Sequence, residues 1–313
     1  MVLELANPAG IVLRRDAIAA GYDDNALARC LRQGTLVRLR QGAYVRADLW
    51  SRLDPADRHR TLCLAVMLQY GDDVALSHES ACVVQGGPTW GLDLSSVHLT
   101  HFHDEHAGRR YAGLVHHEGS CRVDDLSRDG DGNWITAPTR TVLDTATRNQ
   151  LAVGVCVADD FAHRGLTSEE HLRIGHDTRR TWPDTLHVTR VIDLMDGRSE
   201  SIGETRSRLL MRAARLPIPV LQFEVFHPSG RLAGRCDLAL PEHGLLIEFD
   251  GKIKYHRYRR EGETIEEMVL REKEREDELR ELTGWKLIRL VWADLHRPEA
   301  TAERIRQQIK KSA

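Results

Sequence analysis

Apolar residues recur at helical and strand spacings through the first 47 positions. Between residues 13 and 20 they suit a short helix, which Gly21 ends. A second helix is predicted from the acidic cap at residue 23 or 24 up to Gly34. The stretch 35–46, TLVRLRQGAYVR, reads as two short strands around a turn. Two helices followed by a hairpin predict a winged helix-turn-helix, whose second helix enters the major groove of DNA.

The middle of the chain, residues 56–194, mixes both patterns. Helical spacing is found at 58–71, 77–86 and 139–149, and strand-like runs at 95–102 and 112–119. We therefore expect a mixed α/β domain in this part of the chain.

The pattern becomes more regular after a small, polar stretch at 193–204, DLMDGRSESIGE. Helix, three strands, helix, strand and helix follow, at 204–217, 220–227, 235–241, 245–251, 261–283, 285–292 and 298–313. This order predicts a mixed α/β sandwich. The chain is thus assigned to the α/β class as an α+β multidomain protein, with domains at 1–55, 56–194 and 195–313.

The composition of the chain indicates where in the cell the protein is located. The chain has 313 residues, of which 41% are hydrophobic and 29% charged, an ordinary globular composition. It has no apolar run long enough for a membrane span and no signal-peptide pattern. Its six cysteines are scattered, without a C-x-x-C pair. We expect a cytoplasmic protein without a membrane partner; its oligomeric state is left open.

The net charge of -3 conceals a basic segment. From residue 29 to 46 there are five arginines and no acid. Arg29 and Arg32 on the second helix, with Arg38 and Arg40 on the hairpin, are predicted to meet DNA phosphates. The alternative is a small helix-hairpin unit whose arginines are solvated or dock a protein partner.

Four segments of the first half resemble the AbiEi family of abortive-infection antitoxins: AIAAGYDDNALARCLRQGTLVRLRQGAYV, VALSHESACVVQGGP, VHLTHFHDEHAGRRYAGLVHHEG and ITAPTRTVLDTA. The resemblance implies that the first domain binds operator DNA and represses transcription, while the next domain supports antitoxin function. It also implies a cognate toxin as a protein partner.

Two motifs of the middle domain are assigned structural roles. His101, His103 and His106 in HFHDEH do not match a defined zinc pattern, and the acids between them predict an exposed loop. Ser77 is expected to cap a helix, and it is not expected to face its neighbour His78.

Acidic residues occur within otherwise apolar strands of the last domain. Glu248, Asp250 and Lys252 lie two apart and so share one face of a strand. A hairpin would bring Asp237 beside them. Buried carboxylates need a partner, and oxygen ligands suit Mg²⁺ (or Mn²⁺), so Asp237, Glu248 and Asp250 are candidate metal ligands. Lys252 would orient a water molecule or stabilise charge on a phosphate.

This arrangement resembles the PD-(D/E)XK nucleases, and residues 202–295 are similar to domains related to the very-short-patch repair endonuclease. Asp237 matches the acid of the second core strand, DGK at 250–252 matches (D/E)-X-K, and Glu204 matches the acid of the first helix. Either Glu248 or Asp250 heads the motif. The resemblance implies a metal-dependent endonuclease whose catalytic residues are Asp237, Glu248, Asp250, Lys252 and Glu204, with His256 as a further candidate.

Three functions follow from these patterns. The leading hypothesis is a DNA-binding protein with a magnesium-dependent endonuclease domain. The second is a non-enzymatic AbiEi-like antitoxin and transcriptional repressor, in which the nuclease fold is degenerate and the strand charges are solvated or paired with arginines of the following helix. In the third, the last domain binds a toxin or another protein directly.

Overall fold

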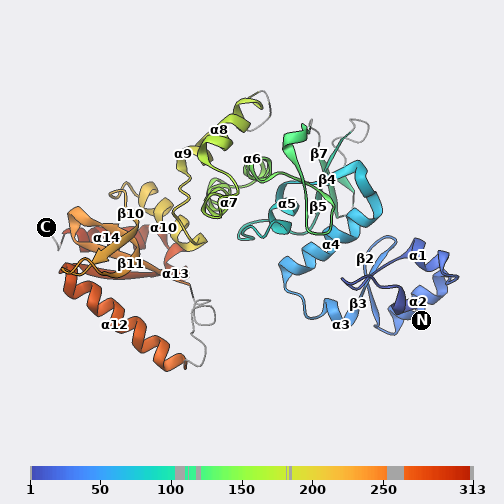
Figure 1. Cartoon of the computed structure of the whole chain (residues 1–313), viewed down its shortest axis with the longest axis horizontal. Coiled ribbons are helices and arrows are strands. Elements are labelled where there is room, and N and C mark those ends of the chain that lie inside the picture. Colours follow the sequence, from blue (N-terminus) through green and yellow to red (C-terminus); the bar gives the residue numbers. More distant parts are fainter. Residues whose placement is uncertain are drawn as a thin grey trace. The chain divides into compact units, whose positions relative to one another are not determined.

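The computed structural model in Figure 1 describes residues 2–102, 110–111, 113–117, 121–180, 182, 185–251 and 264–310. The chain divides into two compact units, one of Met1–Val157 with Leu166–Ile192 and one of Ala158–Gly165 with Asp193–Ala313. The described residues form three sheets among many helices, which confirms the predicted α/β multidomain class. The domain boundaries at 55 and 194 stay predictions.

The first 50 residues fold as a winged helix. The elements are η1 (Val2–Leu5), β1 (Ile11–Leu13), α1 (Arg14–Ala19), α2 (Asp24–Arg32), β2 (Leu36–Arg40), β3 (Ala43–Arg46) and α3 (Ala47–Trp50). The strands form an antiparallel sheet in the order β1-β3-β2. Both predicted helices and the hairpin are confirmed. Strand β1 was missed, because three buried residues are too few to show alternation.

This small sheet is covered on both faces. One face packs on α1 and α2, through Val12, Leu36 and Tyr44 with Ala17 and Leu27. The other packs on α4 (Pro55–Tyr70), where Ala65 contacts the cluster of Ile11, Leu13 and Ala43. The next residue of α4, Val66, belongs to the core of the following sheet. The helix is shared by two sheets, which explains its continuous apolar run CLAVML.

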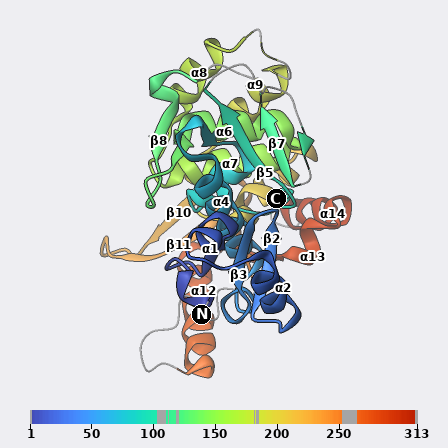
Figure 2. The same ribbon diagram turned by 90° about the vertical axis from the view of Figure 1, so that its right-hand side faces the viewer.

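A six-stranded sheet forms the centre of the first unit (Figure 2). Its elements are η2 (Gly71–Asp73), β4 (Val74–Leu76), α5 (His78–Val84), β5 (Val97–His101), β6 (Arg110–Tyr111), β7 (Leu114–His117), η4 (Val123–Asp125), β8 (Leu126–Arg128) and β9 (Trp134–Thr136). The strand order is β6-β7-β5-β4-β9-β8. Four helices follow: α6 (Pro138–Arg148), α7 (Leu151–His163), α8 (Glu169–Asp177) and α9 (Thr185–Leu194).

The second unit contains a four-stranded sheet in the order β10-β11-β12-β13. Its elements are α10 (Ile202–Ala213), β10 (Val220–Phe226), β11 (Leu232–Leu240), η5 (Pro241–His243), β12 (Leu245–Asp250), α12 (Ile265–Thr283), β13 (Lys286–Val291), α13 (Trp292–Leu295) and α14 (Pro298–Lys310). The first three strands are antiparallel, and β13 runs parallel to β12. The predicted order of elements is confirmed, with α13 added.

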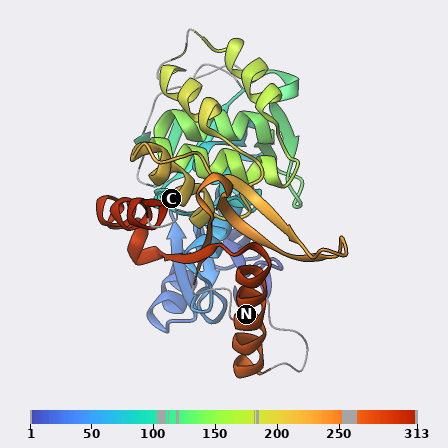
Figure 3. The ribbon, with the colours of Figure 1, turned by 90° about the vertical axis from the view of Figure 1, so that its left-hand side faces the viewer.

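Helices cover both faces of this sheet (Figures 1 and 3). On one face, Leu210 and Met211 of α10 and Ile305 of α14 pack against the apolar side of β12. On the other, Leu279 of α12 packs against Leu246. The predicted sandwich is therefore present. None of the helices in the described part of the chain is long and apolar enough to cross a bilayer.

Candidate functional site

Helix α2 presents one polar face to solvent. The side chain of Asp23 caps its first turn by accepting a hydrogen bond of 2.8 Å from a backbone amide. Leu27 is buried and holds the helix on the sheet. Asn25, Arg29 and Arg32 are exposed, and their i, i+4, i+7 spacing places them along one side of the helix.

The two arginines of the hairpin differ in their surroundings. Arg38 is exposed on β2. Arg40 is half-buried: its guanidinium donates a hydrogen bond of 2.7 Å to Gln69 Oε1 on α4 and lies over the ring of Tyr70. Arg40 therefore helps to fix the hairpin on α4, whereas Arg38 is open to a partner.

The exposed arginines of this surface make no close pair with an acid within the described residues, although Asp23 and Arg29 act on each other through their charges. Nearby acids are already engaged, since Asp24 pairs with Arg14 at 2.6 Å and Asp48 with Arg46 at 2.7 Å. By contrast, the side chains of Arg29, Arg32 and Arg38 form no ion pair within the described residues. Positive potential thus accumulates on α2 and β2.

In the second unit, Glu204 lies buried in the first turn of α10, with 4% of its surface exposed. Its Oε1 accepts a hydrogen bond from the Ser201 hydroxyl (2.7 Å). Its Oε2 accepts from the Glu200 amide (2.9 Å) and the Gln222 side chain (2.7 Å). Burial and the negative charge of Asp237 outweigh these bonds and raise the pKa of Glu204 to about 7.

Asp237 lies where two strands separate. Pairing between β11 and β12 runs from Leu240 opposite Leu245 to Leu238 opposite Ile247. Beyond that point the Asp237 Oδ2 accepts a hydrogen bond of 2.8 Å from the backbone N–H of Phe249. A side chain thus replaces a backbone carbonyl in the ladder and brings a carboxylate close to Glu204.

Glu248 points toward α12. The Arg275 guanidinium donates to its Oε1 at 2.5 Å and to Glu272 at 2.6 Å, while Arg289 pairs with Glu276. Burial raises the pKa of Glu248, and Arg275 opposes this rise. Oxygens of Glu248, Glu272 and Glu276 lie within 4.8 Å of one another. This charge is paired with an arginine of the following helix, which is the alternative that the sequence left open.

The other predicted site residues lie at or beyond the end of β12. Asp250 is half-buried at the last position of the strand. Lys252 and His256 lie outside the described residues. Among the side chains that the structure describes, two groups of three bring metal-ligating atoms within 4.8 Å, and neither contains Asp237 or Asp250. The metal and catalytic roles of these residues stay predictions.

The predictions for two histidine motifs fare differently. The exposed loop predicted for HFHDEH is wrong for His101, which ends β5, is half-buried and forms a hydrogen bond of 2.5 Å with the ring of His116. His103 and His106 lie outside the described residues. Ser77 occupies the N-cap position of α5, as predicted, but its side chain accepts no capping hydrogen bond from the first turn. Its hydroxyl nevertheless lies 2.9 Å from His78 Nδ1, so the expectation that these neighbours do not face each other is wrong. The cause is the backbone of His78, whose φ of 51° turns the side chain back.

Sequence reasoning missed a second group of histidines. His78, His98 and His117 meet in the first unit, although they come from α5, β5 and β7 and lie about 20 residues apart. No spacing rule connects them, and only the topology of the sheet brings them together. Burial lowers the pKa of His98 to about 4.

Comparison with known proteins finds one similarity limited to the N-terminal residues and others that extend over most of the chain. A family model described as "Transcriptional regulator, AbiEi antitoxin" matches residues 1–47. Two Mycobacterium tuberculosis proteins, the uncharacterized proteins MT2308 (strain CDC 1551 / Oshkosh) and Rv2248 (strain ATCC 25618 / H37Rv), are each 26% identical over 238 residues, or 75% of this chain and 83% of the relative. The crystal structure of RV2827C protein from Mycobacterium tuberculosis covers 72% of this chain and 87% of its own, with a TM-score of 0.41 and 16% identity.

The family match and the fold agree for the N-terminal domain. Residues 1–47 form an AbiEi antitoxin-type domain, which confirms the resemblance seen in the sequence for this segment. A winged helix with an exposed basic face is the structure found there. This domain indicates a DNA-binding transcriptional regulator. The resemblance of residues 202–295 to nucleases stays a prediction.

Proposed function

We propose that this protein regulates transcription by placing α2 in the major groove of an operator. The observation that carries the proposal is the set of three exposed arginines, Arg29, Arg32 and Arg38, that lack an ion pair within the described residues. Unpaired arginines on a recognition helix and its hairpin supply the phosphate and base contacts that winged helices use.

The position of each side chain assigns it a role. In a recognition helix the N-terminal residues contact base edges. Asn25 lies in the first turn of α2 and Arg29 one turn later, so they would read bases, an amide suiting adenine and a guanidinium suiting guanine. Arg32, in the last turn, and Arg38, on β2, would contact phosphates on either side.

Selection of binding sites from a random duplex library tests this assignment. The wild-type chain is expected to enrich a defined sequence, and the double variant Asn25→Ala/Arg29→Ala to lose preference at two or more positions, each by roughly 1–3 kcal/mol. Failure of the wild-type protein to enrich any sequence would count against operator recognition.

The match to an antitoxin family also supports a protein partner. We propose a cognate toxin as that partner. Co-expression with the gene next to its own, followed by purification of the full chain, is expected to yield a stable complex that persists in Arg29→Ala/Arg32→Ala. A chain that purifies alone, with no effect on the toxicity of the neighbouring product, would contradict this.

A second activity is proposed for the other unit, hydrolysis of DNA phosphodiester bonds. The observation in its favour is the pair formed by the buried Glu204 and the half-buried Asp237, whose mutual repulsion a cation would relieve. Glu204, Asp237 and Asp250 offer oxygen donors that suit Mg²⁺ or Mn²⁺, whereas Glu248 is already neutralised by Arg275. When bound, such an ion polarises a phosphoryl oxygen and lowers the pKa of a bound water.

Incubation of the full chain with plasmid and mismatched duplex DNA in Mg²⁺ or Mn²⁺ tests the nuclease proposal. Cleavage by the wild type that disappears in Asp237→Asn supports it. The Asn side chain can still accept the hydrogen bond of Phe249, so folding is retained. Intact DNA under all these conditions would leave the second unit as a binding module, with the DNA-binding proposal unaffected.

A further inference from the structure

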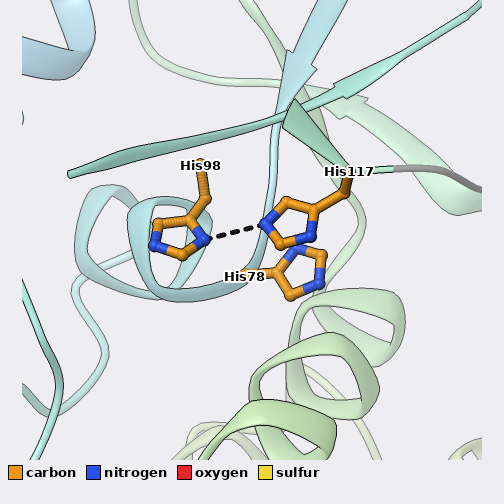
Figure 4. A group of neighbouring side chains, drawn as sticks. All are labelled: His78, His98 and His117. Carbon is orange, nitrogen blue, oxygen red and sulfur yellow. Dashed lines mark hydrogen bonds between the residues drawn. The ribbon is translucent and has the colours of Figure 1, made fainter. Parts of the chain in front are cut away.

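Three histidines of the first unit meet at one point. Figure 4 shows His98 Nδ1 facing the His117 ring, with His78 stacked beneath that ring. The nitrogens His98 Nδ1 and His117 Nε2 are 2.8 Å apart, and the ring centroids of His78 and His117 are 3.6 Å apart. One nitrogen from each ring lies within 4.8 Å of the other two. His78 and His98 are buried, and His117 is half-buried.

Each histidine is held by a different element, so the arrangement is built by the fold. His98 is the second residue of β5, and its amide donates a 2.9 Å hydrogen bond to Ser80 Oγ. His117 ends the neighbouring parallel strand β7, opposite Thr100. His78 begins α5 with a φ of 51°, a backbone conformation that residues other than glycine seldom adopt.

Two buried carboxylates surround the three rings. Glu79 Oε2 lies 3.3 Å from His98 Nδ1, and Asp144 Oδ2 lies 3.9 Å from His78 Nδ1. Both side chains are at least 96% buried, and these two oxygens accept no hydrogen bond within the described residues. Buried carboxylate oxygens without a donor are costly, and such oxygens commonly accompany histidines that bind a metal.

We propose that His78, His98 and His117 bind one divalent transition-metal ion of the Zn²⁺ class, with Glu79 and Asp144 as the surrounding carboxylates. Imidazole nitrogens are preferred ligands of Zn²⁺ and Co²⁺, whereas Mg²⁺ and Ca²⁺ require oxygen ligands. Three histidines leave the fourth position of a tetrahedral shell to a water molecule or to Glu79 Oε2.

Binding requires a local rearrangement: the hydrogen bond between His98 and His117 gives way to the ion, and His78, whose ring stacks on that of His117 at 3.6 Å, turns to direct a nitrogen toward it. Two ligands at about 2.0–2.1 Å from a tetrahedral zinc lie roughly 3.3 Å apart, so the 2.8 Å pair of His98 and His117 needs to open by only about half an ångström. Asp144 already pairs with Arg140 at 2.6 Å and Glu79 with Arg148 at 3.5 Å, so the cation would share these two carboxylates with two arginines. The site would connect α5, β5 and β7, and it is separate from both functions proposed above.

Metal titration of the full chain tests the site. Co²⁺ is added to metal-free wild-type protein while the absorption of tetrahedral cobalt is followed, and Zn²⁺ then competes for the ion. We expect saturation at one equivalent, displacement by Zn²⁺ and no displacement by Mg²⁺. His98→Gln and His117→Gln should abolish the cobalt spectrum, and Glu79→Gln should weaken binding roughly 10- to 100-fold.

Two matched variants act as controls. His171→Gln removes an exposed histidine of α8, and Glu242→Gln removes an exposed acid of η5; both should bind like the wild type. Imidazole ¹H–¹⁵N spectra of the unmodified chain give a second measurement that does not depend on how the variants fold. Zn²⁺ should shift three histidines. An absence of saturable binding to the wild type, equal binding by His117→Gln, or spectra in which other histidines respond would overturn the proposal.

Discussion

The pKa of Glu204 in the second unit is set by two opposing effects. Hydrogen bonds to Glu204 favour its charged form, while burial and the charge of Asp237 raise its pKa from 4.5 to about 7. Its folded pKa thus lies above its unfolded value. The folded state binds more protons between these pH values, so this group weakens the fold as pH rises through that range.

We therefore predict a pH-dependent stability in the absence of divalent ions. In a chelating buffer, the free energy of unfolding should fall by up to about 3 kcal/mol between pH 5 and pH 8. Asp237→Asn removes the repelling charge and should flatten this dependence, whereas Glu242→Gln, which removes an exposed acid, should not. Denaturant titrations at several pH values measure the effect. An unchanged slope in Asp237→Asn would contradict it.

The charge of Glu248 depends on one arginine. Because this carboxylate is buried and Arg275 donates to it at 2.5 Å, Arg275→Ala would leave a buried charge without its partner. We predict a loss of about 3 kcal/mol in the free energy of unfolding, measured by urea titration. Arg280→Ala on the same helix removes an exposed pair with Asp277 and a longer contact of 4.0 Å with Glu276, which Arg289 still pairs, and should cost less than about 1 kcal/mol. Equal losses would show that Glu248 is not held in this way.

At the scale of elements, α10 lies unusually close to β12. A Cβ atom on Gly203 would lie 2.0 Å from the ring of Phe249, so only glycine fits there. Gly203→Ala should force the helix and strand apart and lower stability by about 1–3 kcal/mol, with a lowered Tm. Gly130→Ala, where no atom lies within 4 Å of the added carbon, is the matched control and should change little. A neutral Gly203→Ala would contradict the close packing.

Elements with a strong local pattern were predictable from the sequence. The helices of the winged domain and the strands of the second unit carry caps, glycine stops and apolar runs, and the structure has them in the expected order. Short strands such as β1 carry too few residues for a pattern. The partner of each charged strand residue also depends on tertiary packing. Glu248 and Asp250 share a strand face, but only the position of α12 shows that Arg275 neutralises Glu248.

The group of His78, His98 and His117 could not be predicted from the sequence, for a different reason. Its members come from one helix and two strands, and β5 and β7 pair although residues between them form β6. Long-range pairing of this sort leaves no trace in local spacing. Metal motifs are recognised by ligands close together in the chain, so HFHDEH is the histidine cluster that local spacing brings up, and its spacing matches no defined zinc pattern.

At the scale of the whole molecule, the first unit contains the DNA-binding surface and the histidine group, and the second contains the acidic pair. The winged helix is fixed to the six-stranded sheet through α4, since both sheets pack on this helix. The central claim is that the unpaired arginines on α2 and β2 bind DNA.

The salt dependence of DNA binding tests that claim most directly. The affinity of the full chain for a DNA duplex of roughly 30 base pairs is measured by fluorescence anisotropy at several NaCl concentrations. Arg32→Ala/Arg38→Ala should weaken binding and reduce the slope of log K against log[salt] by about 1.8, or 0.9 for each lost phosphate contact. Arg173→Ala/Arg180→Ala, which removes one paired arginine within α8 and one just after it, should leave the slope unchanged. Equal slopes for both double variants would contradict the account.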